Sequence, residues 1–204
     1  MKKIILTLFT AISITPVAFA QTITLASYDI PVSTTTISSV AGTAASGVTA
    51  GSITIGSGLT LSSSSGGWRG TGYNQAGQDA TALAAANSGG DYWAFSMSAQ
   101  ANYQVTLNGF GSVGFVGSNT GPKNWALLYS TSSDFSSPTT VVASTISPSS
   151  TAVMTTTAWS AALTATPISI SAGNTAYFRI VGYGASGTTG TGGLAGALGT
   201  ADFT

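Results

Sequence analysis

The chain has 204 residues, of which 43% are hydrophobic and only 5% are charged, and it contains no His, no Cys and no Glu. An average soluble protein is about 25% charged. Without His or Cys the chain cannot form a Ser-His-Asp triad, a Cys-His pair or a zinc site built from those ligands. Its length suits a single domain with a substantial core.

The first twenty residues have the pattern of a secretory signal peptide. Lys2 and Lys3 precede a mostly apolar run over residues 4–14, and Ala18–Ala20 forms a small-x-small ending before Gln21. The run is short and interrupted for a membrane span, which needs about 20 apolar residues. We therefore predict cleavage after Ala20 and a secreted or cell-surface domain over residues 21–204, without a membrane span.

The predicted mature chain carries few and scattered charges. Three basic residues, Arg69, Lys123 and Arg179, stand against five Asp and give a net charge of −2. Nucleic acids and anionic lipids are bound by clustered Lys and Arg, so we predict neither as a partner. Since there is no Cys, a secreted chain of this kind depends on its core for stability. Ser and Thr make up about 30% of the residues, which suits a bacterial surface or matrix protein.

Short strands separated by Gly, Ser, Thr, Pro and Asn clusters are predicted along the whole mature chain. Trp93, Phe95 and Met97 alternate with smaller residues and would share one face of a half-buried strand. The expected strands cover residues 22–28, 52–61, 92–98, 103–107, 111–116, 124–129, 139–145, 152–157, 167–171, 176–183 and 202–204.

One segment, residues 78–87, has helical character, with Asp79 near its start and Gly89–Gly90 after its end. Many short strands and almost no helix predict an all-β fold, a two-sheet antiparallel sandwich of jelly-roll type with at most one short helix. A closed up-and-down barrel is the second alternative. The segments are too short for an outer-membrane barrel, whose strands have about 9 to 11 residues.

Seven landmarks follow one another along the chain: Leu25–Asp29, Gly47–Ala50, Gly56–Thr60, Gly90–Ser96, Gly121–Ser130, Tyr177–Ala185 and Ala201–Thr204. In this order they resemble the secreted β-sandwich domain of bacterial PEP-CTERM-type surface and matrix proteins, over nearly all of residues 22–204. The resemblance implies a jelly-roll-like fold and export to the envelope or the exopolysaccharide matrix. Such proteins usually end in a Pro-Glu-Pro motif, a hydrophobic span and a basic tail, which the sequence up to Thr204 lacks.

Two carboxylates are candidate metal ligands. Asp29 follows the first expected strand and Asp202 begins the last one, and the first and last strands of a jelly roll commonly lie close together. With backbone carbonyls they would form an oxygen site for a structural Ca²⁺ ion, which takes about six to eight ligands. The alternative is that each Asp caps a turn. No other cofactor is expected.

The aromatic residues of a Gly-rich segment are candidate sugar-binding residues. Trp68, Arg69 and Tyr73 lie within residues 66–73, and Trp159 and Tyr183 would join them. Trp and Tyr stack on sugar faces, and loops on a rigid sandwich often bind ligands. The alternative is that each aromatic side chain folds back over the core, as we expect for Trp93 and Trp125.

Two further patterns receive ordinary structural interpretations. Residues 190–195 match G-x-G-x-x-A, but no room remains for the helix and strand of a dinucleotide site, so we predict a flexible loop. Asp91 and Asp134 are a conceivable glycosidase pair, yet Asp91 opens a strand and Asp134 lies in a Ser-rich turn, which favours turn roles.

These observations predict a non-enzymatic, secreted structural or adhesive module of the bacterial cell surface or extracellular polysaccharide matrix. Its expected partners are polysaccharide or other copies of itself, the latter through edge strands. The alternative is a carbohydrate-binding module stabilised by calcium.

Overall fold

The structure is a computed structural model, and it describes residues 23–31, 36–64, 66–146, 153–154 and 156–195. Within these residues the chain forms sixteen strands and two helices, and every strand pair is antiparallel. The all-β prediction is confirmed, while the jelly-roll arrangement stays a prediction. No helix in the described part of the chain is long and apolar enough to cross a membrane. The expected signal peptide and the expected strand at 202–204 lie outside the described residues.

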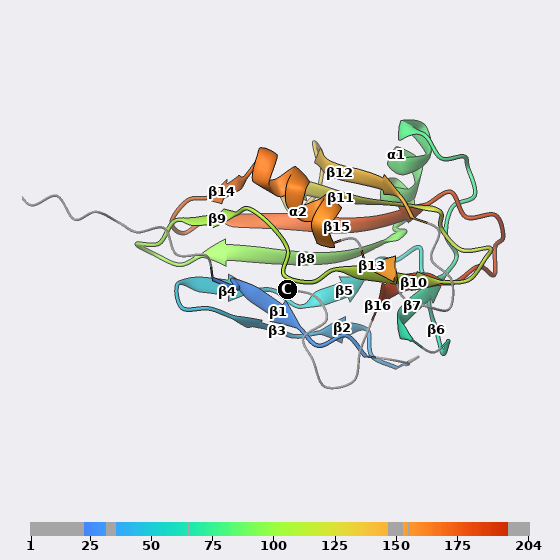
Figure 1. Cartoon of the computed structure of the whole chain (residues 1–204), viewed down its shortest axis with the longest axis horizontal. Coiled ribbons are helices and arrows are strands. Elements are labelled where there is room, and N and C mark those ends of the chain that lie inside the picture. Colours follow the sequence, from blue (N-terminus) through green and yellow to red (C-terminus); the bar gives the residue numbers. More distant parts are fainter. Residues whose placement is uncertain (1–22, 32–35, 65, 147–152, 155, 196–204) are drawn as a thin grey trace, which may run out of the picture.

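A seven-stranded sheet forms one layer of the sandwich (Figure 1). Its central strand β8 alternates as the sequence predicts, because Trp93, Phe95 and Met97 are buried while Tyr92 and Ala94 are half-buried. Phe95 stacks on Phe178 of the neighbouring strand, with ring centroids 4.9 Å apart. In sheet order the strands are β12 (Thr139–Thr145), β11 (Asn124–Ser130), β15 (Thr175–Tyr183), β8 (Tyr92–Ala99), β5 (Ile53–Ile55) and β2 (Ser39–Val40), and β4 (Val48–Ala50) also pairs with β8.

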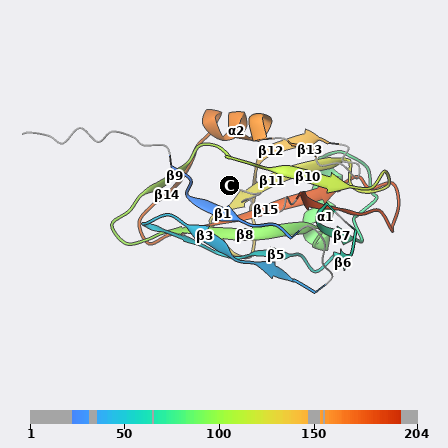
Figure 2. The ribbon, with the colours of Figure 1, turned by 60° about the horizontal axis from the view of Figure 1, so that its bottom comes forward.

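The second layer consists of separate pieces (Figure 2). A five-stranded sheet joins β13 (Val153–Met154), β10 (Gly114–Gly117), β16 (Gly192–Ala195), β7 (Gly67–Thr71) and β6 (Thr60–Ser62). Two two-stranded ladders join β1 (Ala26–Tyr28) with β3 (Gly42–Ala44), and β9 (Val105–Leu107) with β14 (Ile168–Ile170). Strand order therefore divides this layer into a broad sheet and two narrow ladders.

The core between the layers is rich in Trp. Trp68, Trp93, Trp125 and Trp159 are all 0% exposed, and they come from four different elements. The rings of Trp68 and Trp93 lie 4.5 Å apart between their centroids, which joins the five-stranded sheet to the seven-stranded one. The core assignment of Trp93 and Trp125 is confirmed.

Helix α1 (Ala80–Gly89) confirms the expected helix, two residues further along the chain. The Asp79 carboxylate accepts a hydrogen bond from the Ala82 amide at 2.9 Å, and Gly90 ends the helix with φ of 91°. Leu83 and Ala86 of α1 are buried with Ala126, Leu128 and Val181 on the outer face of the seven-stranded sheet.

The sequence predicts a strand over residues 152–157, of which Val153–Met154 form β13, while a second helix, α2 (Thr156–Ala165), begins at the end of this segment. Trp159 and Leu163, four residues apart and both 0% exposed, lie on one side of this helix. The three β-branched Thr residues of this segment favour a strand, but burial of one helical face outweighs their weak propensity. The expectation of at most one short helix is therefore wrong.

Strands β7 and β16 also differ from the prediction, which places loops at both segments. They pair with each other, with Gly193 opposite Arg69. A Cβ atom at Gly193 would overlap the Trp68 carbonyl oxygen, so the close approach of these two strands requires Gly at this position. Each of these short strands contains two Gly residues, so the sequence shows no clear alternation, and this explains why both were missed.

Candidate functional site

The predicted sugar-binding residues lie inside the sandwich. Trp68 is 0% exposed, and its indole Nε1 donates a hydrogen bond to the Ile37 carbonyl at 2.9 Å. Tyr73 is 2% exposed, and its hydroxyl donates to the Gly192 carbonyl at 2.8 Å. Trp159 and Tyr183 are buried as well. The expected exposed loop is wrong, because most of residues 66–73 form β7 between β6 and β16.

Arg69 is also buried, with 4% of its surface exposed. Its Nε has no hydrogen-bond partner in the described part of the chain, and burial lowers the pKa of the guanidinium. Ligand binding by Trp68, Arg69 and Tyr73 stays a prediction, and it would require β7 to move.

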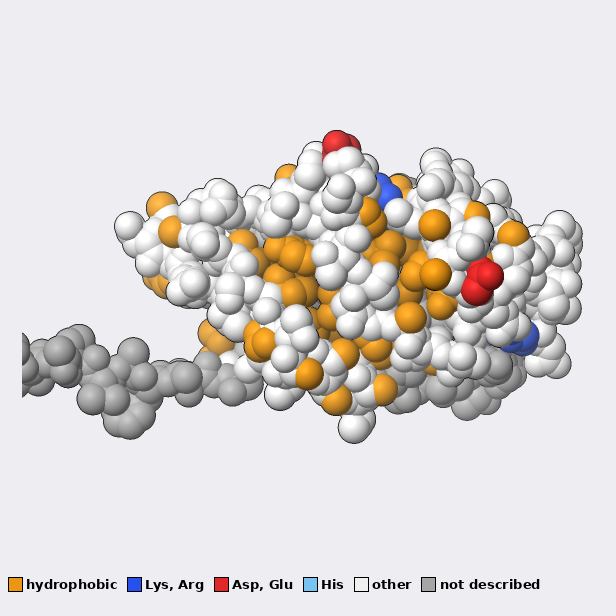
Figure 3. All heavy atoms as spheres, turned by 90° about the horizontal axis from the view of Figure 1, so that it is seen from above, with side chains coloured by type: hydrophobic (Ala, Val, Ile, Leu, Met, Phe, Trp, Pro, Cys, Tyr) orange, Lys and Arg blue, Asp and Glu red, His pale blue; other side chains and the backbone are white. Residues whose placement is uncertain are grey.

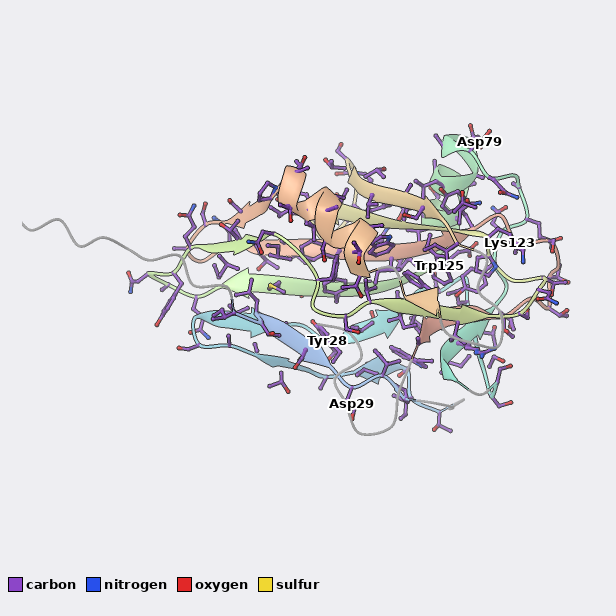
Figure 4. All side chains as sticks on the ribbon, in the orientation of Figure 1. Tyr28, Asp29, Asp79, Lys123 and Trp125 are labelled. Atoms are coloured by element: carbon purple, nitrogen blue, oxygen red, sulfur yellow. The ribbon has the colours of Figure 1, made fainter. Side chains whose placement is uncertain are left out.

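Only one of the two predicted calcium ligands lies within the described residues. Asp29 is exposed directly after β1, and Figure 4 places it below the ribbon of that strand. Asp202 lies outside the described residues. The described residues contain no group of three or more carboxylates that would hold a metal ion. Calcium binding by Asp29 and Asp202 therefore stays a prediction.

Asp134 has the predicted turn role, whereas Asp91 bonds to a segment 17 residues away in the sequence. Asp91 is 3% exposed, and its carboxylate accepts a hydrogen bond from the Asn74 amide at 2.6 Å. Burial raises the pKa of Asp91. The exposed Asp134 accepts a hydrogen bond from the Ser136 amide at 2.9 Å, and such bonds lower its pKa.

Most other charged groups of the described residues also make internal contacts. The guanidinium of Arg179 lies 4.1 Å from the Tyr92 ring centroid and 3.9 Å from that of Phe135. Its Nη1 donates to Asn87 Oδ1 at 2.9 Å, which ties α1 to β15. Lys123 donates to the Asn119 carbonyl. Figure 3 shows the result on one face of the molecule, where few charged side chains stand among hydrophobic and uncharged ones.

An apolar groove of about 1050 Å³ is a candidate site. Phe95 and Met97 of β8 contribute to its lining, together with Tyr28 of β1 and with Val105 and Leu107 of β9. No charged side chain is among its described lining residues. The groove is lined by residues from two segments, 23–28 and 103–111, that are far apart in the sequence.

Two exposed hydrophobic residues also line this groove. Ile23 and Tyr103 are each 48% exposed, and of the large hydrophobic residues described only Ile37 shares such exposure, at 42%. Tyr103 rests on Gly47, whose φ is +82° and where a Cβ atom would overlap the ring. The turn below it is fixed by hydrogen bonds from Gln100 N to the Gly47 carbonyl at 2.9 Å and from Tyr103 N to the Gln100 carbonyl at 3.1 Å.

Strand β9 belongs to a narrow ladder beside the groove. In the described part of the chain β9 pairs with β14 alone. A strand edge without a neighbour presents backbone N–H and C=O groups that another strand can join. The groove thus combines an apolar lining with a strand that can take part in further pairing.

The edge strand β12 is a poorer candidate for pairing. It has no charged residue, but its register with β11 shifts at Leu127 and Leu128. Val141 and Val142 both pack against the core at this irregularity. Bulges of this kind twist an edge away from a partner strand and so discourage pairing.

Comparisons with protein-family models, with curated proteins and with solved structures find no match. The resemblance to PEP-CTERM-type proteins is therefore still a prediction from the sequence.

Proposed function

We propose that this protein is a non-enzymatic structural and adhesive module, secreted to the bacterial cell surface or the extracellular polysaccharide matrix, whose copies associate through the apolar groove. The observation behind the proposal is that two half-exposed hydrophobic residues, Ile23 and Tyr103, both line the apolar groove. Exposed apolar patches next to a groove are typical of interaction sites.

A second copy of the chain is the occupant that the chemistry favours. The described groove lining has no charge, and the predicted mature chain has a net charge of only −2, so copies repel one another weakly. Strand β9, which pairs only with β14 in the described part of the chain, can pair with a further strand, whereas an acyl chain would leave the backbone groups of its edge without hydrogen bonds.

Substitution at the two exposed residues tests the proposal. We expect Ile23→Ser with Tyr103→Ser to lower concentration-dependent association, measured by sedimentation velocity and light scattering. The matched control is Ile37→Ser, which removes an equally exposed side chain that is not in the groove lining.

Equal association of both variants and the parent chain would contradict the proposal. Saturable glycan binding by a chain that stays monomeric at all concentrations would instead favour the carbohydrate-binding alternative. Turnover of a glycan would contradict the non-enzymatic role.

A further inference from the structure

A separate, polar hollow of about 470 Å³ lies where β11 ends and β14 turns into β15. None of its described lining residues also lines the apolar groove. Its volume is within the range of about 300 to 1000 Å³ typical of small-ligand sites. Association between copies through the apolar groove therefore does not involve this hollow.

The lining is uncharged and rich in hydrogen-bonding groups. It includes the half-buried rings of Tyr129 and Tyr177 and the side chains of Thr131, Ser171 and Asn174. In the described residues these five side chains make no hydrogen bond, whereas the nearby Thr175 hydroxyl already bonds with Ser98 at 2.8 Å. Phenol, hydroxyl and amide groups are thus available to a ligand.

The turn that forms one side of the hollow is held firmly. Gly173 N donates to the Ala99 carbonyl at 2.9 Å, and Ala99 N donates to the Asn174 carbonyl at 3.1 Å. Within the turn, Asn174 N donates to the Ser171 carbonyl at 3.0 Å. Gly173 has φ of +74°, and a Cβ atom there would meet nothing within 4 Å, so the turn is open to an approaching ligand. A site whose backbone is already fixed loses little entropy when a ligand binds.

The composition of the lining selects the class of ligand. Anionic groups are recognised by Arg or Lys, and none lines the hollow in the described residues. Acyl chains would leave the hydroxyl and amide groups without partners. Neutral sugars combine apolar C–H faces, which stack on Tyr, with hydroxyl groups that donate and accept hydrogen bonds.

We propose that this hollow binds a neutral saccharide unit of an extracellular polysaccharide, with Tyr129 and Asn174 as contact residues. This site acts independently of association through the groove. A single chain would hold glycan at one place and a second copy of itself at another.

Affinity electrophoresis of the purified chain tests this inference, with gels containing hydroxyethyl cellulose, laminarin, galactomannan or alginate. We expect retardation by at least one of the three neutral polymers. We expect Tyr129→Phe and Asn174→Ala each to weaken that binding by about 2- to 10-fold, as the loss of one neutral hydrogen bond does.

The control Tyr103→Phe removes a phenol hydroxyl from the apolar groove and leaves the hollow unchanged. It is expected to bind like the parent chain. Tyr129→Phe keeps the ring that packs 5.7 Å from Phe178 between centroids, so a loss of binding would not reflect unfolding. Retardation by alginate alone, by no polymer, or equally in all variants would overturn the proposal.

Discussion

The two parts of the second layer differ in how completely they cover the seven-stranded sheet. The five-stranded sheet places Trp68 and Phe115 against Trp93 and Trp125, all of them 0% exposed. The two-stranded ladders instead border a groove with exposed hydrophobic residues. One part of the sandwich therefore buries its large aromatic rings completely, and the other leaves some apolar side chains half-exposed.

The largest loss of stability is expected from Trp125→Ala, in the part of the core that the five-stranded sheet covers. Trp125 stacks on Phe115 at 4.4 Å between ring centroids, and truncating a buried Trp costs about 3–5 kcal/mol of unfolding free energy. Urea denaturation of this variant, and of the milder Trp125→Phe, measures the loss.

The matched variant beside the two-stranded ladders is Tyr103→Ala. We expect it to lower the free energy of unfolding by less than about 1 kcal/mol, because the ring is half-exposed. Equal losses at Trp125 and Tyr103 would contradict the difference between the two parts.

Gly47→Ala should have an intermediate effect that links stability to association. The positive φ of Gly47 disfavours Ala, and the added Cβ atom would displace the Tyr103 ring. We expect a loss of about 1–2 kcal/mol in thermal denaturation together with weaker association. Gly173→Ala has a similar φ with open space around it, so it should share the loss of stability but not the loss of association.

Asp79→Ala removes the N-terminal cap of α1. Loss of the bond from the Ala82 amide should lower stability by about 1 kcal/mol, measured by urea denaturation. Asp79→Asn keeps a capping oxygen and should lose little. A larger loss for Asn than for Ala would exclude capping as the role of this residue.

The smallest effect is the pH dependence from Asp91. Because burial raises its pKa in the folded chain, the native state binds this proton more tightly, and the carboxylate lowers stability as pH rises above the unfolded value. Asp91→Asn should therefore melt at a higher temperature than the parent at pH 7, and the gap should close toward pH 3.

Asp134→Asn is the control of opposite sign. Hydrogen bonds lower the pKa of Asp134 in the folded chain. The parent should therefore melt at a higher temperature than this variant at pH 7, and the difference should disappear as the pH falls. A gap for Asp91→Asn that widens toward pH 3 would show that the carboxylate stabilises the fold.

The sequence was most informative where side chains alternate or cap an element. Strands β8 and β15 and helix α1 were predicted because their residues carry a periodic pattern or a cap. Strands β7 and β16 were missed because Gly leaves no pattern, and the same Gly residues made Trp68 look like a loop residue. The groove arises from segments about 80 residues apart in the chain, and no local pattern shows that Ile23 and Tyr103 share it.

The internal contacts of the basic residues have a consequence for the resistance of the folded chain to proteolysis. Proteases of the trypsin class cleave after Lys or Arg, and the described residues offer them only Arg69, Lys123 and Arg179. Arg69 is buried in β7, Arg179 is clamped between two aromatic rings, and Lys123 is half-buried beside β11. The folded domain therefore presents no exposed cleavage site of this kind in its described part, so cleavage there by such proteases requires the chain to unfold locally first.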